Sequence, residues 1–406
     1  MIKLNVWVTS SQGETIRAGD LVVADPDLQG RLEGQFRYSQ EYLAHPAVFP
    51  LDPIHLPLST ENFNSDRPHS GVHGVFEDSL PDDWGRRLLA RRYKLERKNQ
   101  RVPELLWLLG GQGMGALSYG KDDVIPVKKE AVDGRYLVDL QRLAAKFEED
   151  PTLIDDEMTL LFQAGSSPGG ARPKALIKDK KKAYLAKFSS VRDQFDVVSL
   201  EAATMDLARQ AGVSAAPTKL VPCGVKKALL VERFDINNLN MGRNHLISMQ
   251  TLLKADGYYY AGYRDLADII RRVSSNPGGD LLKLFKQLVF NVMIGNTDDH
   301  LKNFCMIYDG DGWKLSPAFD LVPNIGLNRE HVLRIGHSTV VDNREALIQE
   351  AKHFGMKQQK VVKQIIAAMY EVVSGWEKIF YRHGVPARDI NIIGQDIDQR
   401  TAMLRE

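Results

Sequence analysis

One segment sets the strongest limit on how this chain can fold: residues 279–296, which read "GDLLKLFKQLVFNVMIGN". Apolar residues cover almost every face of the helix that this pattern predicts, so the helix has to be buried inside a larger helical body. At 406 residues the chain is too long for a single hydrophobic core, and its length predicts two or three domains. We therefore expect a helical lobe built around this segment.

The predicted helix ends at a glycine and is followed by a run of polar residues. Gly295 precedes "NTDDH", and Asn303 comes five residues after Asp298. Next come "FCMIY", the turn "DGDG" and "WKLSPAFD", which predict a β-hairpin that returns the chain to Asp320. The hydrophobic strands would act as a spacer that brings Asp298, Asn303 and Asp320 together. Asp299 is expected to be solvated.

Three converging oxygen-bearing side chains suit a hard divalent cation such as Mg²⁺. An Asp five residues before an Asn is also the spacing of a phosphoryl-transfer loop, in which the Asp deprotonates the attacking hydroxyl while the Asn and a later Asp bind metal. The spacing alone occurs often by chance. Asp298 could be a polar residue at a helix end, and Asp320 a turn carboxylate. The ordered triple after a buried helix favours phosphoryl transfer.

Two further residues of the loop carry charge. No second His or Cys lies at the spacing that a zinc site would need with His300. This favours a structural role for His300, holding the loop, over a role as a zinc ligand. Lys302 could neutralise a transferring phosphate or pair with a carboxylate. Both His300 and Lys302 are candidate ATP-binding residues.

The N-terminal region has a different pattern. Residues 1–75 carry short alternating runs broken by Gly, Pro, Asn and Asp, which indicate a small β-rich unit. A helix then follows, for which Asp78 or Ser79 could be the cap and Pro81 part of the first turn. Eight basic residues lie between Arg86 and Arg101. They form either a solvated helix face or a patch that contacts phosphates.

A second β-rich stretch lies in the middle of the chain. A helix over about 136–149 precedes "ARPKALIKDKKKAYLAKFSS", which predicts strand, lysine-rich turn and strand. A helix over "DVVSLEAATMDLARQAG" ends at Gly212, and a further hairpin follows in "TKLVPCGVKKALLVERFD".

Lys187 lies among the apolar residues of the second predicted strand. A lysine there is costly unless it has a partner. Glu201 is a candidate partner, and such a pair is typical of a nucleotide phosphate grip. An edge-strand lysine with an exposed head is the alternative. The upstream "AGSSPGGARPK" offers backbone N–H groups that could approach phosphates, although it is not a Walker A loop and could be any flexible loop.

Composition excludes some classes of protein. Lys plus Arg number 53 against 52 for Asp plus Glu, so no global charge would draw the chain to DNA or membranes. The two cysteines, Cys223 and Cys305, lack CxxC spacing and fit a reducing cytosol. The N-terminus lacks the apolar region of a signal peptide, and no apolar run approaches the roughly 20 residues that span a bilayer. These features predict a cytoplasmic protein.

Taken together, these segments resemble the HipA family of bacterial serine/threonine kinase toxins. The resemblance extends over nearly the whole chain, in the family's order. The matching stretches are "GQFRYSQEYL", "FEDSLPDDWGRRLL", "GMGALSYG", "SSPGGARPKALI", "AYLAKF", "LEAATMDLARQAG", "LLVERFD", "NVMIGNTDDHLKNF" and "LSPAFDLVP".

The resemblance implies a role for each matching position. Asp298 would be the catalytic base, Asn303 and Asp320 would bind Mg²⁺, and Lys187 would hold ATP phosphates. The backbone of Glu232, Arg233 and Phe234 would bind adenine. Gly169, Gly170 and Ala171 would belong to the phosphate loop. Ser167 would be autophosphorylated, with the adjacent Ser166 as second choice.

The resemblance also implies an architecture and partners. We expect an α+β, two-lobed protein-kinase-like fold with an additional N-terminal β-rich subdomain and a mainly helical C-terminal lobe. The expected domains are 1–118, 119–235 and 236–406. A small helix-turn-helix antitoxin would connect the chain to operator DNA, and the substrate would be a protein such as an aminoacyl-tRNA synthetase. The alternatives are a small-molecule kinase of the aminoglycoside phosphotransferase type and a catalytically idle co-repressor scaffold.

Overall fold

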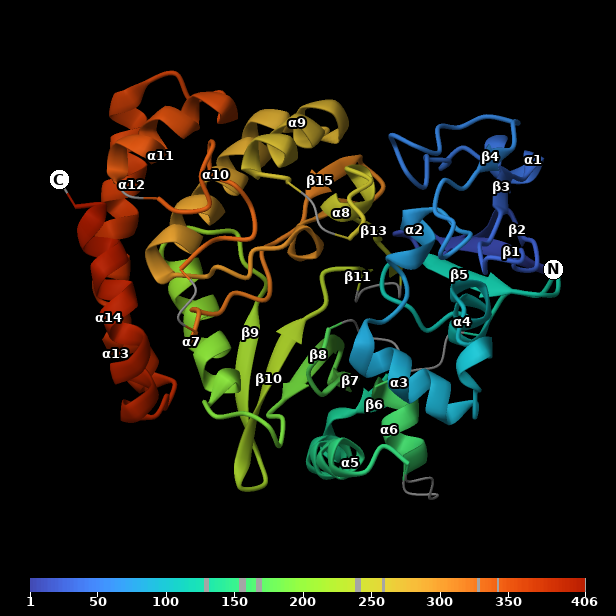
Figure 1. Cartoon of the computed structure of the whole chain (residues 1–406), viewed down its shortest axis with the longest axis horizontal. Coiled ribbons are helices and arrows are strands. Elements are labelled where there is room, and N and C mark those ends of the chain that lie inside the picture. Colours follow the sequence, from blue (N-terminus) through green and yellow to red (C-terminus); the bar gives the residue numbers. More distant parts are fainter. Residues whose placement is uncertain are drawn as a thin grey trace. The chain divides into compact units, whose positions relative to one another are not determined.

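A computed structural model gives the three-dimensional structure of the chain (Figure 1). It describes residues 1–127, 131–152, 158–165, 170–237, 242–257, 260–326, 329–341 and 343–405. The chain forms two compact units. Unit 1 contains Met1–Val191, Glu232–Ile247 and Ile307–Gly312, and unit 2 contains Arg192–Val231, Ser248–Met306 and Trp313–Glu406. The three domains expected from the sequence stay a prediction. Within the described residues, no helix combines the length and apolar character needed to cross a membrane.

Unit 1 begins with strands and continues with short helices. Its elements are β1 (Ile2–Thr9), β2 (Thr15–Val23), β3 (Gly34–Tyr38), α1 (Gln40–Leu43), β4 (Phe63–Asn64), α2 (Gly74–Glu77), α3 (Asp83–Arg92), η1 (Arg97–Asn99), α4 (Val102–Leu109), β5 (Leu117–Gly120), β6 (Val132–Asp133), η2 (Gly134–Tyr136), α5 (Leu137–Glu149), α6 (Met158–Gly165), β7 (Lys174–Asp179), β8 (Lys182–Phe188), β11 (Ile236–Asn237) and β12 (Gly242–Arg243). Three strands belong partly to each unit: β10 (Lys226–Glu232), β13 (His245–Ser248) and β14 (Cys305–Tyr308).

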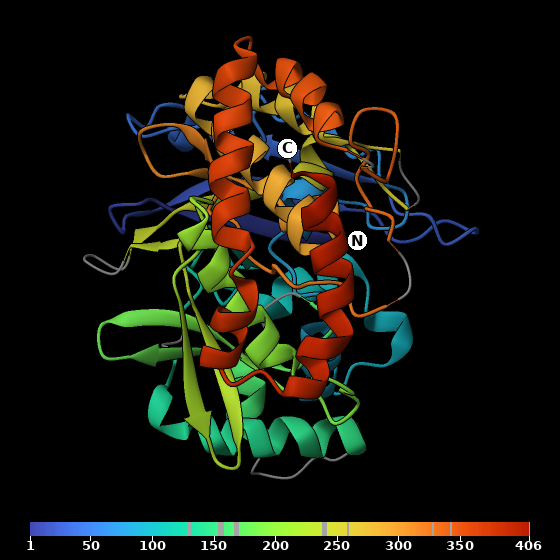
Figure 2. The ribbon, with the colours of Figure 1, turned by 90° about the vertical axis from the view of Figure 1, so that its left-hand side faces the viewer.

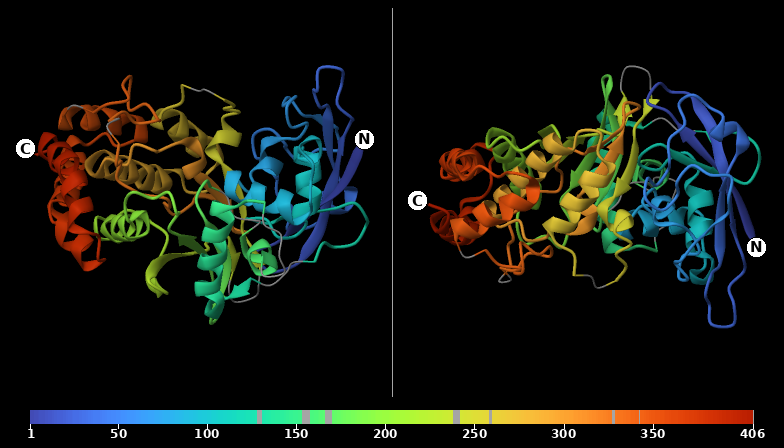
Figure 3. Two further views of the ribbon diagram at one scale, coloured as in Figure 1. Left: turned by 60° about the horizontal axis from the view of Figure 1, so that its bottom comes forward. Right: turned by 90° about the horizontal axis from the view of Figure 1, so that it is seen from above.

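The N-terminal strands form an antiparallel sheet in the order β4-β3-β2-β1-β5. Leu4, Leu21 and Phe36 lie opposite one another on β1, β2 and β3, and all three are fully buried. Such a cross-strand row of apolar side chains is what the alternating sequence pattern requires. Both views in Figure 3 show β1, β2 and β3 in blue. The predicted β-rich N-terminus is confirmed.

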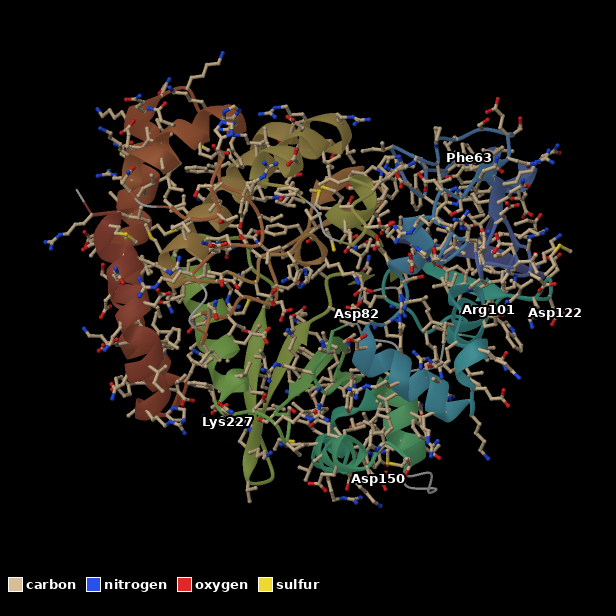
Figure 4. The ribbon with its side chains drawn as sticks, viewed as in Figure 1. Phe63, Asp82, Arg101, Asp122, Asp150 and Lys227 are labelled. Atoms are coloured by element: carbon tan, nitrogen blue, oxygen red, sulfur yellow. The ribbon has the colours of Figure 1, made fainter. Side chains whose placement is uncertain are left out.

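The basic helix α3 begins later than its sequence suggested. Its N-cap is Asp82, not Asp78 or Ser79. Asp78 instead closes the preceding helix α2, and the Ser79 hydroxyl bonds the Phe76 carbonyl and the Tyr119 hydroxyl. The cap prediction was wrong because Asp78 ends α2 through its backbone N–H, and the Ser79 hydroxyl is bound to Phe76 and to the distant Tyr119. Asp82, labelled in Figure 4 at the start of α3, accepts a hydrogen bond from the backbone N–H of Gly170 at 2.8 Å.

The arginines of α3 also bond within unit 1. Arg86 donates to the Pro81 carbonyl at 2.8 Å, and Arg91 donates to the Thr152 carbonyl. Arg92 donates to the Phe162 carbonyl at 3.4 Å. Arg87 donates to the Asp83 carbonyl at 3.4 Å, so four of the eight basic residues bind backbone carbonyls of the fold. Neither of the two interpretations of this stretch anticipated this arrangement.

The middle of unit 1 is a second sheet segment. β6 pairs with β7 in parallel, and β7 pairs with β8 as an antiparallel hairpin whose turn contains Lys180 with φ 55°. The predicted strand, turn and strand over 171–190 are confirmed. The predicted helix over about 136–149 is α5.

His245, at the start of β13, is buried in unit 1 with 2% of its surface exposed. Its Nε2–H donates to the Leu51 carbonyl at 2.9 Å, and the ring centroid lies 5.6 Å from that of Phe49. Burial lowers the pKa of this imidazole to about 4, although the hydrogen bond to Leu51 acts in the opposite direction. The folded protein therefore holds His245 neutral.

This burial predicts a pH-dependent loss of stability. The unfolded imidazole has an ordinary pKa of 6.5 and the folded one about 4. The contribution of His245 to the free energy of unfolding is therefore fully present above pH 6.5. It falls by about 3 kcal/mol as the pH decreases toward 4. Urea unfolding at several pH values should show a shallower loss in His245→Gln, which keeps an N–H donor but takes up no proton. Parallel pH profiles for the two proteins would contradict this assignment.

Unit 2 is mainly helical. Its elements are α7 (Val197–Gln210), β9 (Thr218–Cys223), α8 (Met249–Leu252), α9 (Tyr263–Val273), α10 (Pro277–Ile294), η3 (Leu301–Asn303), β15 (Trp313–Leu315), α11 (Arg344–Glu350), η4 (Ala351–Phe354), α12 (Gln359–Val373), α13 (Trp376–Arg382) and α14 (Ala387–Met403). Figure 2 looks onto the C-terminal helices of this unit, in orange and red.

Helix α10 is the centre of unit 2. The Asn276 side chain caps its first turn, Pro277 occupies its first position, and α9, α12 and α14 pack around it. Leu284, Leu288 and Ile294 are fully buried. The buried helix predicted from the sequence is confirmed, and it carries the loop that follows into the interior of the unit.

Candidate active site

The loop after α10 starts at a position that only glycine fits. Gly295 has φ 70°, in the left-handed region, and a Cβ atom there would lie 2.8 Å from the Asp396 carboxylate. Its carbonyl accepts a hydrogen bond from the Asn324 N–H at 2.8 Å. The end of α10 and the path of residues 296–300 are therefore set by contacts within unit 2.

Asp298 and Asn303 meet through the turn of η3. The Asn303 Nδ2 donates to the backbone carbonyl of Asp298 at 3.0 Å, and the Asn303 N–H donates to the His300 carbonyl at 2.9 Å. Asn303 is only 8% exposed, whereas the Asp298 side chain is exposed. The five-residue spacing thus closes one compact turn.

The charge of Asp320 affects the pKa of the Asp298 carboxyl group. Loss of hydration raises the pKa of the Asp298 carboxyl; the nearby charge of His300 lowers it, and the Asp320 and Asp299 carboxylates raise it. The β14–β15 hairpin that returns the chain is closed by the Ser316 N–H and the Cys305 carbonyl at 2.9 Å. Asp320 has φ 57°, a left-handed conformation that few residues besides Gly, Asn and Asp adopt readily.

The expectation that Asp299 is solvated was wrong. Asp299 is 1% exposed and accepts hydrogen bonds from Tyr263 and His331. Its neighbours, by contrast, are accessible: His300 is half-buried at the N-terminal end of η3, and Lys302 is exposed. A sequence signal did exist, because successive side chains of an extended segment point to opposite sides. An exposed Asp298 therefore implies an inward-facing Asp299.

The donors near Asp298 suit a hard cation better than a soft one. Among the described residues, no three His, Cys, Asp or Glu side chains form a metal-binding group. The candidates are instead two carboxylates, Asp298 and Asp320, and the amide of Asn303, whose Nδ2 faces the loop. Mg²⁺ prefers oxygen ligands such as carboxylates and amide oxygens, and it offsets the repulsion between two carboxylates. The chemistry of these donors suits Mg²⁺, and the magnesium site itself stays a prediction.

The glycine-rich loop in unit 1 is described only at its end. Ser166, Ser167 and Gly169 lie outside the described residues. Gly170 has φ 101°, and a Cβ atom there would lie 1.9 Å from the Lys174 Nζ. A side chain at this position would therefore displace the lysine. Ala171 is exposed.

Two lysines face each other across the β7–β8 hairpin. Lys187 is half-buried on β8 and lies directly opposite Lys174, which is 7% exposed on β7. Like charges in this cross-strand position are destabilising unless an anion lies near them. The sequence analysis identified only Lys187. Antiparallel pairing of the two predicted strands could have indicated Lys174 as well. Glu201 is buried on α7 in unit 2, and its pairing with Lys187 stays a prediction.

The segment 232–234 is held firmly within unit 1. The Arg233 N–H donates to the Ala183 carbonyl at 3.0 Å, and the Phe234 carbonyl accepts from Asn244 at 2.9 Å. The Glu232 carboxylate pairs with Lys182 at 2.8 Å. Adenine recognition by this segment would therefore have to use backbone groups other than the Arg233 N–H.

A buried ion pair fixes the end of this segment. Arg233 binds Asp235 through two hydrogen bonds, of 2.9 and 2.5 Å, and the Gly115 N–H donates to the same carboxylate. Burial alone would raise the pKa of Asp235, but Arg233 and Arg243 lower it to about 2. The segment 232–235 is thereby tied to the start of β5.

Comparison with known proteins places these features in a family. The model of the HipA-like C-terminal domain matches residues 166–376, more than half of the chain, and that of the HipA N-terminal domain matches residues 15–120. The chain belongs to the HipA family. All the candidate residues from Ser166 to Asp320 lie within the HipA-like C-terminal domain.

The names of two relatives support a kinase family. This chain is 27% identical over 352 residues to Y4mE of Sinorhizobium fredii, whose designation as a kinase is provisional, covering 78% of this chain and 81% of that protein. It is 32% identical over 140 residues to the serine/threonine-protein kinase toxin HipA of Shewanella oneidensis, covering 29% of this chain and 32% of the toxin.

A solved structure shows the same fold. HipA in the complex of HipA, HipB and operator DNA from Shewanella oneidensis MR-1 matches with a TM-score of 0.69 at 17% identity, covering 98% of this chain and 96% of the other. The fold of this HipA-family chain is therefore α+β and two-lobed, of the protein-kinase-like type, with an additional N-terminal β-rich part, as expected from the sequence.

Proposed function

We propose that this HipA-family chain is an ATP-dependent serine/threonine protein kinase. The observation that carries the proposal is the compact turn in which the Asn303 side chain donates a hydrogen bond to the backbone carbonyl of Asp298. The charge of the Asp320 carboxylate raises the pKa of the Asp298 side chain in the same place. An exposed carboxylate beside two further oxygen donors suits a base that accepts the proton of a hydroxyl, with Mg²⁺ neutralising the phosphates.

Each candidate residue has a role in this proposal. Asp298 accepts the substrate proton, and Asn303 and Asp320 hold Mg²⁺, which shields the charge of the ATP phosphates when bound. Lys187 binds phosphate oxygens, and the buried Lys174 is a second cation for the same task. His300, Lys302 and the backbone of residues 232–234 complete the ATP-binding set, together with Gly169, Gly170 and Ala171.

A protein substrate is favoured over a small molecule. The N-terminal sheet of unit 1, β4-β3-β2-β1-β5, precedes the HipA-like C-terminal domain and offers surface for docking a protein. A small substrate has no use for it. An aminoacyl-tRNA synthetase is the substrate that the family suggests. An idle co-repressor scaffold is disfavoured because it would not require Lys187, Asp298, Asn303 and Asp320.

A small helix-turn-helix antitoxin is the proposed partner. The matched HipA of Shewanella oneidensis was solved together with HipB and operator DNA. With a net charge of +1, this chain has no overall field for DNA, so we propose that it reaches DNA only through the antitoxin.

The test is incubation of the purified chain with ATP and Mg²⁺, followed by mass spectrometry. We expect phosphate on Ser167, or on the adjacent Ser166, and none when EDTA replaces Mg²⁺. A phosphoserine adds about −1.5 to −2 charges, which would repel ATP phosphates and attract Arg172 and Lys174. The modified chain should therefore bind ATP more weakly. Absence of phosphate transfer to the chain and to a generic serine-containing protein would refute the proposed activity.

A further inference from the structure

The loop after α10 places two neighbouring aspartates in opposite environments. Asp298 is exposed, whereas Asp299 is buried. Removing a carboxylate from water is costly unless hydrogen-bond donors compensate it. Asp299 has such compensation, and the groups that supply it come from two separate parts of unit 2.

Four donors converge on the Asp299 carboxylate. Its Oδ2 accepts from the Tyr263 hydroxyl at 2.7 Å and from the His331 Nδ1 at 2.9 Å. Its Oδ1 accepts from the backbone N–H of Val332 at 2.9 Å and of Leu333 at 3.3 Å. Tyr263 and His331 are themselves buried. The carboxylate therefore joins the loop to the start of α9 and to the segment 331–333.

The network continues back into α10. The Asn291 Nδ2 donates to the Tyr263 hydroxyl at 2.9 Å, and the Asn296 Nδ2 donates to the Asn291 Oδ1 at 3.1 Å. Both asparagines are buried. The Val332 N–H also donates to the Thr297 carbonyl at 3.1 Å. Residues on both sides of Asp298 are thus held by one continuous set of buried polar contacts, a far more connected arrangement than packing alone would need.

We propose that Asp299, together with Tyr263 and His331, is a positioning group that fixes the backbone of this loop so that Asp298 stays oriented for proton transfer. The inference rests on the function proposed above. Because the Asp298 side chain is exposed, its direction depends on the backbone that Asp299 holds. A displacement of about 1 Å in a reacting group can lower a rate by about 100-fold.

The test uses Asp299→Asn, which keeps the size of the side chain but turns an N–H₂ group toward donors. We expect kcat for phosphoryl transfer to fall by about 100-fold, while the KM for ATP changes little. Amide hydrogen exchange of residues 295–303 and 331–333 should become faster. Tyr263→Phe removes a single donor and is the milder variant if Asp299→Asn fails to fold; its kcat should fall by about tenfold.

The matched control is Asp389→Asn. Asp389 is a buried carboxylate of the same unit that accepts a hydrogen bond from the Asp196 N–H at 2.8 Å. It is separate from the network around Asp299. It should lose stability and keep kcat. An equal fall of kcat in the control, or an unchanged kcat in folded Asp299→Asn, overturns the positioning role. An inactive wild type would instead refute the proposed function, and the exchange measurement would then still decide whether Asp299 anchors the loop.

Discussion

Asp298→Asn is expected to lower the rate of phosphoryl transfer by about 10²–10⁴-fold, because the variant retains the shape of the side chain but has no basic oxygen to accept the substrate proton. ATP binding should remain close to that of the wild type. A general base acts on the hydroxyl of the substrate, not on the nucleotide. The measurement is the transfer rate at saturating ATP, accompanied by a separate ATP titration.

The surroundings of Asp298 indicate that this variant changes the carboxylate without disturbing the structure of the loop. The contact that places Asn303 uses the backbone carbonyl of residue 298, so it survives the exchange of side chains. Folding should also be preserved, since the Asp298 side chain is exposed. The control is Asp309→Asn, an aspartate of the hairpin turn. If Asp298→Asn transferred phosphate as fast as that control, the assignment of the base would be wrong.

The sequence predicted those parts of the fold that depend on local pattern. The long apolar run was enough to predict α10 as a buried helix, and Gly295 marked its end because its left-handed backbone favours glycine. The hairpin that returns the chain to Asp320 followed from the "DGDG" turn. These elements are fixed by residues close together in the sequence.

Features set by distant contacts were missed. Asp82 became the cap of α3 because Ser79 bonds Tyr119 and Asp78 closes α2. Asp299 is buried because Tyr263 and His331, both more than 30 positions away, supply its donors. None of these partners could be identified before the chain was folded.

Asp320→Asn is the second substitution with a large expected effect. Asp320 has φ 57°, where Asn is tolerated and Ala is strained, so Asn removes the charge while preserving the backbone. A bound divalent cation supplies several kcal/mol of charge stabilisation, and the loss of a carboxylate ligand should lower kcat/KM for Mg-ATP by about 100-fold or more. Unlike Asp298→Asn, this variant should bind Mg-ATP weakly.

The comparison of cation conditions identifies the cause. In EDTA, Asp320→Asn should bind ATP at least as tightly as the wild type, because it lacks the charge that repels the phosphates. In Mg²⁺ only the wild type should gain affinity, because the cation converts repulsion between Asp320 and the phosphates into coordination. Asp320→Ala should show the same binding defect plus a loss of about 1 kcal/mol in unfolding free energy from its left-handed backbone. Equal gains from Mg²⁺ in wild type and Asp320→Asn would mean that Asp320 does not hold the metal. A binding defect in Asp320→Ala alone would show that backbone strain, not charge, is responsible.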